Sequence, residues 1–261
     1  MKLYHYTTFS NFCSIWMQQR LKFSEWTNSN DVYEREKAFN FTQNSREYNG
    51  KVFTPEVFKK FTSNVYNEIK LYRQVSFCMD YKDGVKGYAS PIMWGHYARD
   101  HQRSGVCIEF DYSKIKYSKQ LKLYKGKVYY KTCLESTHIG GVDAEMNDAA
   151  QQFVILNQKE LFFNKHKHWK YENEYRFISK ECDFLDISDA ITSIYVLGED
   201  DITLESVRRI IMDSEKVTFL NVGGVKTLTL NPINLYDYEI AKEELKYFTA
   251  NPHLLFQKKS Q

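Results

Sequence analysis

Two glutamates, Glu172 and Glu174, lie two positions apart in residues 169–178, which read Trp-Lys-Tyr-Glu-Asn-Glu-Tyr-Arg-Phe-Ile. This stretch alternates polar and bulky β-forming residues, which predicts a strand. On a strand, both carboxylates would point to one face about 7 Å apart. Paired carboxylates can move a proton or stabilise developing positive charge. We therefore expect Glu174 to be catalytic.

Two other interpretations of the same residues stay open. The acids could lie on a solvated strand edge and pair with Lys165, Lys167 and Arg176, because most charge runs are solvated faces. His166 and His168 could bind a metal together with Glu172. The lysines around these histidines disfavour a cation, so we predict no metal site.

The composition indicates one globular domain. The chain has 261 residues, 43% of them hydrophobic, and no Pro-, Gly- or Ser-rich linker. We expect a single domain over 1–261, with the motifs in 1–200, further strands and a helix in 201–250 and a frayed tail at 251–261. The 16% aromatic content suits stacking on rings or bases, or simply an aromatic-rich core.

Charge and cysteine usage narrow the class of protein. A net charge of +3 is too small to indicate a nucleic-acid-binding protein by itself, although residues 112–131 are locally rich in Lys and Tyr. The five cysteines are widely separated, which indicates reduced thiols and no zinc site of the usual spacing. No signal peptide or membrane-spanning run is apparent. We expect a cytoplasmic protein with no membrane association.

The hydrophobic pattern predicts a mixed α+β fold, because strands outnumber helices without regular βαβ alternation. Predicted strands cover 2–6, 21–24, 74–79, 105–110, 121–131 as an edge, 172–178, 191–197, 216–221 and 225–230. Predicted helices begin after Thr8 or Ser10, after Asp31 and at Pro55, and cover 92–98, 145–163, 204–212 and 237–248. In the longest of them the candidate core residues are Met146, Ala150, Phe153, Leu156, Leu161 and Phe162.

Three blocks of sequence resemble the ADP-ribosyltransferase superfamily, in particular its H-Y-E branch of poly(ADP-ribose) polymerases, tRNA 2′-phosphotransferases and DarT-type toxins. The first block is Leu3-Tyr4-His5-Tyr6-Thr7-Thr8, followed by a helix and Leu21-Lys22-Phe23-Ser24. The second is Ser76-Phe77-Cys78-Met79-Asp80, a helix bearing Trp94 and Tyr97, and the strand 105–110. The third is Asn173-Glu174-Tyr175. The chain is also similar to uncharacterised bacterial proteins with L-Y-H-Y-T, M-W-x-H-Y-A, G-V-C-I-x-F-D and W-x-x-E-x-E-Y-R motifs.

The resemblance implies a split mixed β-sheet flanked by helices, NAD as co-substrate, and a role for each matching residue. His5 would bind the adenine-side ribose, and Tyr97, or Trp94 one turn away, would stack on nicotinamide, although both rings could equally be core residues. Glu174 would stabilise the oxocarbenium-like charge, and Glu172 would be an acceptor-side base. Further expected NAD contacts are Tyr6, where polymerases have Gly, Thr7, Phe77 and Asn30; a helix cap would explain Asp31 adequately. Expected acceptor contacts are Lys165, Lys167 and Arg176.

The expected function is therefore transfer of ADP-ribose from NAD to a macromolecule. Bacterial relatives of this type are often toxins or antiphage effectors, and the Lys- and Tyr-rich segments favour a DNA or RNA base over a protein as acceptor. An inhibitory, antitoxin-type protein would fit such a role. Alternatives are NAD hydrolysis with water as acceptor, modification of a protein, and a binding module that has lost the chemistry.

Overall fold

The computed structural model describes residues 1–31, 34, 47–48, 51–98, 105–132, 143–197, 217–223 and 229–233. Its helices are α1 (Phe9–Gln18), α3 (Pro55–Lys70), α4 (Pro91–Tyr97), α5 (Ala149–Leu156) and α6 (Gln158–Phe162), with 3-10 helices η1 (Trp26–Asn28), η3 (Gly87–Ala89), η4 (Tyr112–Lys114) and η5 (Lys167–Glu172). Its first strands are β1 (Lys2–Thr8), β2 (Arg20–Lys22), β3 (Ser24–Glu25), β4 (Glu47–Tyr48), β5 (Lys51–Val52), β6 (Arg73–Met79), β7 (Gly105–Asp111) and β8 (Tyr124–Lys127). The later strands are β9 (Tyr129–Lys131), β10 (Asn164–His166), β11 (Glu174–Ser179), β12 (Phe184–Asp186), β13 (Ile191–Leu197), β14 (Val217–Gly223) and β15 (Thr229–Ile233).

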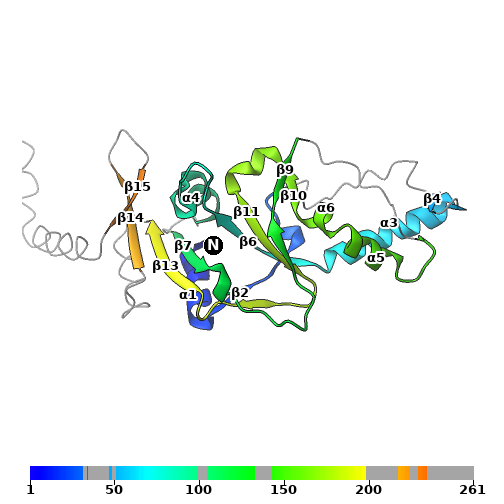
Figure 1. Cartoon of the computed structure of the whole chain (residues 1–261), viewed down its shortest axis with the longest axis horizontal. Coiled ribbons are helices and arrows are strands. Elements are labelled where there is room, and N and C mark those ends of the chain that lie inside the picture. The colour runs from blue at the N-terminus through cyan, green and yellow to red at the C-terminus, as the bar shows by residue number, and fades with distance from the viewer. Residues whose placement is uncertain are drawn as a thin grey trace, which may run out of the picture.

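Among these residues one nine-stranded sheet has the order β15-β14-β13-β7-β1-β6-β11-β8, with β3 also paired to β6. Only β13 and β14 pair in parallel within it, so the sheet is mostly antiparallel. Figure 1 shows α3, α5 and α6 grouped beyond one end of the sheet, with β14 and β15 at the other. The predicted mixed α+β class is confirmed at this level.

The sheet separates into two halves between β1 and β6. β1 pairs with β7 along its whole length, from Lys2 to Thr8, and β6 pairs with β11 from Arg73 to Cys78. In contrast, the register between β1 and β6 covers only the pairs Leu3↔Met79 and Tyr4↔Cys78. Beyond Tyr4 the two strands therefore diverge, and backbone groups facing the gap need other partners.

Side chains alternate between the two faces of the sheet along β1, and a helix packs on each face. Leu3 packs in one buried cluster with Phe9 and Phe12 of α1. Tyr4 and Tyr6 point the other way and pack with Met93 and Trp94 of α4. A third cluster joins α3, α5 and α6 around Trp26, Phe61, Val65, Ile69, Tyr72, Phe153 and Phe162.

Helix starts follow the predicted chemistry. The Oγ1 atom of Thr8 accepts a hydrogen bond from the backbone N–H of Asn11 and caps α1. Thr54 caps α3, which begins at Pro55. Ser90 caps α4 in the same way, with Pro91 in the first turn. None of the helices in the described part of the chain combines the length and apolar character that a membrane crossing requires.

Several predicted boundaries are wrong. The helix predicted over 145–163 is two helices that meet at Asn157, and its candidate core residues Met146 and Leu156 are 50% and 61% exposed. The strand predicted over 121–131 divides at Val128, so that β8 edges the large sheet while β9 pairs with β10. The second C-terminal strand, predicted over 225–230, is described from Thr229 to Ile233, and the first part of the predicted range lies outside the described residues. The helix expected after Asp31 and those at 204–212 and 237–248 lie outside the described residues, apart from Glu34.

Candidate functional site

A pocket of about 190 Å³ opens where β1 and β6 separate. Cavities of about 150 Å³ take up a benzene ring, so this space admits a group of ring size. Its walls come from both halves of the sheet, from β2, the segment after β3, α4, β10 and η5: Tyr4, His5, Tyr6, Lys22, Ser24, Asn28, Ser29, Asn30, Glu34, Gln74, Val75, Ser76, Phe77, Cys78, Met93, Tyr97, Lys165, Glu172, Glu174 and Arg176.

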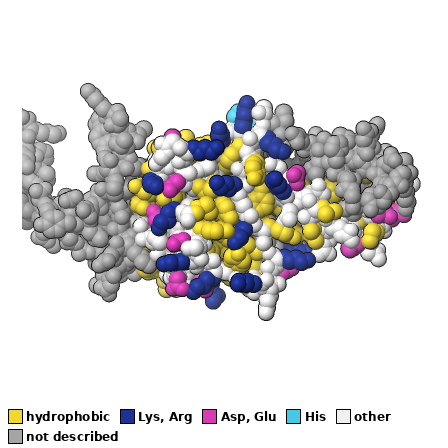
Figure 2. All heavy atoms as spheres, viewed as in Figure 1, with side chains coloured by type: hydrophobic (Ala, Val, Ile, Leu, Met, Phe, Trp, Pro, Cys, Tyr) yellow, Lys and Arg dark blue, Asp and Glu magenta, His cyan; other side chains and the backbone are white. Residues whose placement is uncertain are grey.

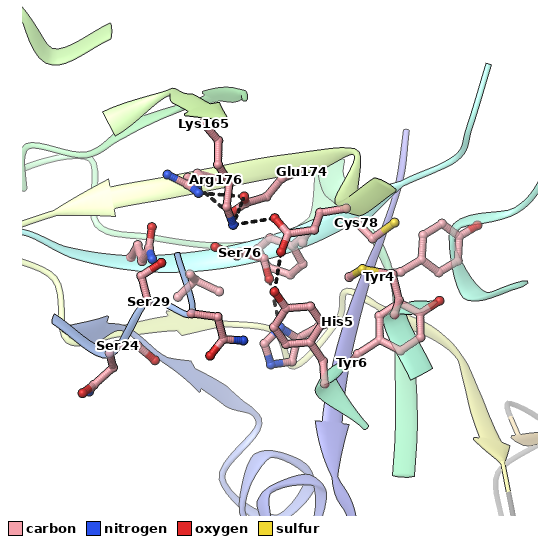
Figure 3. Close-up of a pocket in the computed structure, with 18 of the residues that line it drawn as sticks. Tyr4, His5, Tyr6, Ser24, Ser29, Ser76, Cys78, Lys165, Glu174 and Arg176 are labelled. Atoms are coloured by element: carbon pink, nitrogen blue, oxygen red, sulfur yellow. Dashed lines mark hydrogen bonds and ion pairs between the residues drawn. The ribbon is translucent and has the colours of Figure 1, made fainter. Parts of the chain in front are cut away.

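His5 bridges the gap between the two strands. Its Nδ1 atom lies 3.0 Å from the carbonyl oxygen of Ser76 on β6, as Figure 3 shows. A carbonyl can only accept, so Nδ1 carries the proton and Nε2 of the neutral ring is left as an acceptor. Burial lowers the pKa of His5 despite the opposing effect of the Ser76 carbonyl. The ring is therefore neutral at pH 7 and offers the pocket a hydrogen-bond acceptor.

The two glutamates do not share a strand face, contrary to the prediction. Residues 167–172 form η5, and β11 begins only at Glu174. Asn173 between them has φ 43° and ψ 55°, the left-handed conformation, so the chain turns sharply at this point. Both carboxylates nevertheless reach the pocket, because the turn sends them toward the same amine.

That amine is Lys165 on β10. Its Nζ atom lies 2.6 Å from Oε2 of Glu172, 3.7 Å from Oε2 of Glu174 and 3.8 Å from Oε2 of Glu34. Figure 3 shows Lys165 reaching into the pocket beside Glu174 and Arg176. Burial alone would lower the pKa of Lys165, but the three carboxylates raise it above its ordinary value. The lysine is therefore a fixed cation at the centre of the cluster.

Arg176 holds Glu174 in a two-pronged ion pair. Its Nε lies 2.5 Å from Oε1 of Glu174 and its Nη2 lies 2.7 Å from Oε2. Nη1 of the same guanidinium contacts Oε1 of Glu34 at 2.6 Å and donates to the Phe162 carbonyl at 2.9 Å. Arg176 is 1% exposed, so this pair is buried among its partners.

The pKa values of the two glutamates are driven apart. Burial raises the pKa of Glu174, but Arg176 and Lys165 outweigh it and bring the value to about 2. Burial and the charge of Glu174 raise the pKa of Glu172 to about 7, although Lys165 and Tyr97 oppose them. Three formal negative charges (Glu34, Glu172 and Glu174) against two positive ones (Lys165 and Arg176) give the ionised cluster a net charge of −1. Two carboxylates whose pKa values differ in this way provide one permanent anion, Glu174, and one group that exchanges a proton near neutral pH, Glu172.

Tyr97 closes the same site from α4. Its hydroxyl donates to Oε1 of Glu172. Burial and the Glu172 charge raise the pKa of Tyr97 far above its ordinary value, so the phenol stays protonated. Trp94, the alternative to Tyr97, is 3% exposed; its ring packs edge-on against Tyr6 and it does not line the pocket.

The remaining predicted residues divide between pocket and surroundings. Phe77 and Tyr6 line the pocket, and the exposed Asn30 lies at its margin. Thr7 is buried and lies outside the lining. Lys167 is exposed on η5, whereas Lys165 and Arg176, predicted to contact an acceptor, are buried inside the ion cluster.

Sequence reasoning missed four pocket residues on β6: Gln74, Val75, Ser76 and Cys78. They belong to a strand that was predicted, but nothing local indicates that the sheet divides there. The charge partner Glu34 was not among the predicted site residues. Charge balance is what calls for this third carboxylate, because the two buried cations Lys165 and Arg176 require more than one carboxylate. Within the described residues no group of three or more His, Cys, Asp or Glu side chains is placed to hold a metal ion.

Residues 93–177 match the model of a family described as "Protein of unknown function (DUF2971)". The matched segment runs from α4 to β11. It therefore contains Tyr97, Lys165, both glutamates and Arg176, while His5 precedes it. No curated protein and no solved structure shows a significant match to this chain.

Proposed function

We propose that this chain is an enzyme that cleaves the nicotinamide glycosidic bond of NAD and transfers ADP-ribose to a macromolecule. The observation that carries the proposal is that His5, Tyr97 and Glu174, from three distant parts of the chain, line one pocket. These are the residues that the resemblance to the H-Y-E branch singles out. Their convergence would be a coincidence in a purely structural arrangement.

The charge of the site suits the departure of nicotinamide. When the bond between ribose C1′ and the ring nitrogen breaks, its electron pair goes to the nitrogen and positive charge develops on the ribose. The ionised cluster carries a net charge of −1 and lies in a buried wall, where electrostatic interactions are stronger than in water. Glu174, held by Arg176 in one orientation, supplies a preorganised anion at that point.

Glu174 and Glu172 have different roles in the proposed reaction. With a pKa of about 2, Glu174 stays ionised and does not exchange protons near neutral pH. With a pKa of about 7, Glu172 takes the proton that the acceptor loses as its nucleophilic atom bonds to C1′. The neutral Nε2 of His5 accepts from a ribose hydroxyl. The buried Oε1 of Gln74, which has no hydrogen-bond partner in the described part of the chain, suits a second ligand donor.

The acceptor in this proposal is a DNA or RNA base, in keeping with a bacterial toxin or antiphage effector that an inhibitory protein would restrain. Lys167 is exposed beside the site and is available to a phosphate. Figure 2 shows Lys and Arg side chains spread across one face, intermixed with hydrophobic and acidic side chains. Hydrolysis of NAD is the second candidate, because Lys165 and Arg176 are buried and hold carboxylates instead of facing an acceptor.

Nicotinamide release from NAD, followed by chromatography, tests the proposal. Glu174→Gln should lower the rate by at least about 10²-fold, the usual loss for one preorganised electrostatic group. The matched control is Glu109→Gln on β7. Glu109 is also a buried glutamate, bonded to Lys2, Thr192 and Tyr195, but lies outside the pocket, so its variant should keep the wild-type rate. Equal rates for both variants, or no release by the wild-type protein, would contradict the proposal and favour a binding module.

Labelled NAD separates the two enzymatic outcomes. Label recovered on added oligonucleotide or on protein indicates transfer and identifies the class of acceptor. Free ADP-ribose as the sole product, formed at the same rate with and without added macromolecules, indicates hydrolysis. Glu172→Gln adds a further distinction, because loss of the base should slow transfer more than it slows release of nicotinamide.

A further inference from the structure

The turn that joins η5 to β11 has a backbone conformation that few residues adopt. Asn173 lies in the left-handed region, with φ 43° and ψ 55°. This conformation costs most residues about 1–2 kcal/mol, and Gly, Asn and Asp tolerate it best. Among the described residues the other non-glycine position with positive φ is Gln19, which ends α1 away from the pocket.

The same asparagine fastens this turn to the end of β6. Its side-chain Nδ2 donates to the carbonyl of Met79 at 3.1 Å and to that of Asp80 at 2.9 Å. Its own carbonyl accepts from the backbone N–H of Met79 at 3.0 Å, and its N–H donates to the Lys170 carbonyl at 3.2 Å. Asn173 therefore uses every hydrogen-bonding group except its side-chain oxygen to hold η5 and the start of β11 against the end of β6.

We propose that Asn173 is the positioning residue of the site: its left-handed backbone and its amide clamp bring Glu172 and Glu174 from opposite sides of a turn onto Lys165. An extended backbone at this position would keep the two carboxylates on one strand face, about 7 Å apart along the strand. The clamped turn places one Glu172 oxygen 2.6 Å and one Glu174 oxygen 3.7 Å from the same Nζ atom. The kinetic part of this inference rests on the proposed function, but the geometric part does not.

The pKa of Glu172 can be used to test this clamp, because it depends on the burial of the carboxylate and on the charges around it. The buried position and the nearby Glu174 raise its pKa, and both require the closed turn. The titratable and charged groups that face it come from every element around it: Tyr97 on α4, Cys78 on β6, Tyr81 after β6, Tyr130 on β9, Lys165 on β10, Tyr171 on η5 and Glu174 on β11. A loosened turn admits water and separates the two carboxylates, so the pKa should move toward its ordinary value.

The experiment compares Asn173→Gly, Asn173→Asp and the control Gln19→Gly. The glycine variant keeps access to the left-handed region but lacks the amide, and the aspartate variant has an acceptor where the two carbonyls need a donor. Gln19→Gly makes the same kind of backbone change outside the pocket. The ¹³Cδ signal of Glu172, assigned by its loss in Glu172→Gln, is followed from pH 4 to 9, and nicotinamide release is measured over the same range.

Asn173→Gly should titrate at least about one pH unit lower than the wild-type protein, while Gln19→Gly matches it. The new carboxylate of Asn173→Asp opposes this shift, so that variant is judged by its reduced kcat. The pH profile of nicotinamide release should shift by the same interval, with kcat reduced and KM little changed. An Asn173→Gly titration equal to wild type would overturn the proposal. If no variant releases nicotinamide, the proposed function fails while the titration still decides the role of Asn173.

A measurement on the unmutated protein covers the case in which the variants do not fold. The backbone N–H of Met79 is bonded to the Asn173 carbonyl at 3.0 Å. In a clamped turn this amide should exchange with deuterium as slowly as the ladder amides of β6. Exchange at the rate of an open loop would show that the turn is loose and would refute the clamp.

Discussion

Replacing Glu172 by Gln should change how the stability of the protein depends on pH. Glu172 is 3% exposed, and burial together with the charge of Glu174 raises its pKa from 4.5 to about 7. Between these two values the folded protein keeps a proton on Glu172 that the unfolded chain has lost. The free energy of unfolding therefore falls as the pH rises through this interval, and the decrease ends above pH 7.

The size of the effect follows from the interval. From 4.5 to about 7, at about 1.36 kcal/mol per pH unit, the wild-type protein loses about 3 kcal/mol of stability through this one group. Gln has the shape of the protonated acid and does not titrate, so Glu172→Gln escapes this loss. The variant should match the wild type near pH 4.5 and exceed it by about 3 kcal/mol at pH 8. In thermal unfolding this corresponds to roughly 6–12 °C.

Urea denaturation at 25 °C, monitored by tryptophan fluorescence from pH 4.5 to 8.5, measures this difference. Groups that titrate alike in both proteins cancel, so the difference curve isolates Glu172. Glu109→Gln is the control. Burial raises the pKa of Glu109, but hydrogen bonds from Lys2, Thr192 and Tyr195 lower it overall, so this carboxylate is ionised throughout the upper range. Its difference curve should be flat above pH 5.5. A flat curve for Glu172→Gln would show that Glu172 is ionised alike in the folded protein and the unfolded chain, and would refute the proposed division of roles.

Three further substitutions test other parts of the site. Arg176→Met leaves Glu174, Glu34 and the Phe162 carbonyl without the guanidinium that they share, and should lower the free energy of unfolding by about 3–5 kcal/mol in urea. His5→Asn keeps a donor for the Ser76 carbonyl but lacks Nε2, so calorimetry should show NAD affinity at least about tenfold weaker with little change in Tm, whereas an equal loss of both would make the ring purely structural. Gly87→Ala places a Cβ atom 2.2 Å from the buried ring of Tyr4 and should cost about 1–3 kcal/mol; an unchanged unfolding midpoint would mean that η3 moves freely.

Local patterns predicted the elements whose burial is regular. β1, β6, β7 and β13 alternate or run apolar over their full lengths, and their predicted ranges agree with the structure to within two residues. The helix starts after Thr8 and at Pro55 were equally readable, because a side chain can cap the first turn and proline fits the first helical position. These features depend on neighbours in the sequence.

Features that depend on distant partners were not readable in this way. The apolar periodicity of residues 145–163 continues through Asn157, yet the chain ends one helix there and begins another because α5 packs on α3 and α6 leads into β10. The division of the sheet likewise depends on where β1 and β6 stop pairing. His5 replaces a backbone partner at that point, and no local signal in β1 distinguishes it from a histidine inside a continuous strand.

The glutamate pair shows that spacing can predict which side chains lie together without predicting how they are held. Glu172 and Glu174 of the E-x-E sequence both line the pocket, but the reason given, a shared strand face, is wrong. What brings the carboxylates together is a buried lysine and arginine that cannot remain unpaired, together with a turn that Asn173 tolerates. The third carboxylate comes from Glu34, more than a hundred residues earlier in the chain. Without Glu34, the two cations would be paired only with Glu172 and Glu174, whose like charges repel each other. Charge balance across the fold therefore sets which glutamate stays ionised and which one exchanges a proton, and that division decides the chemistry open to the pocket.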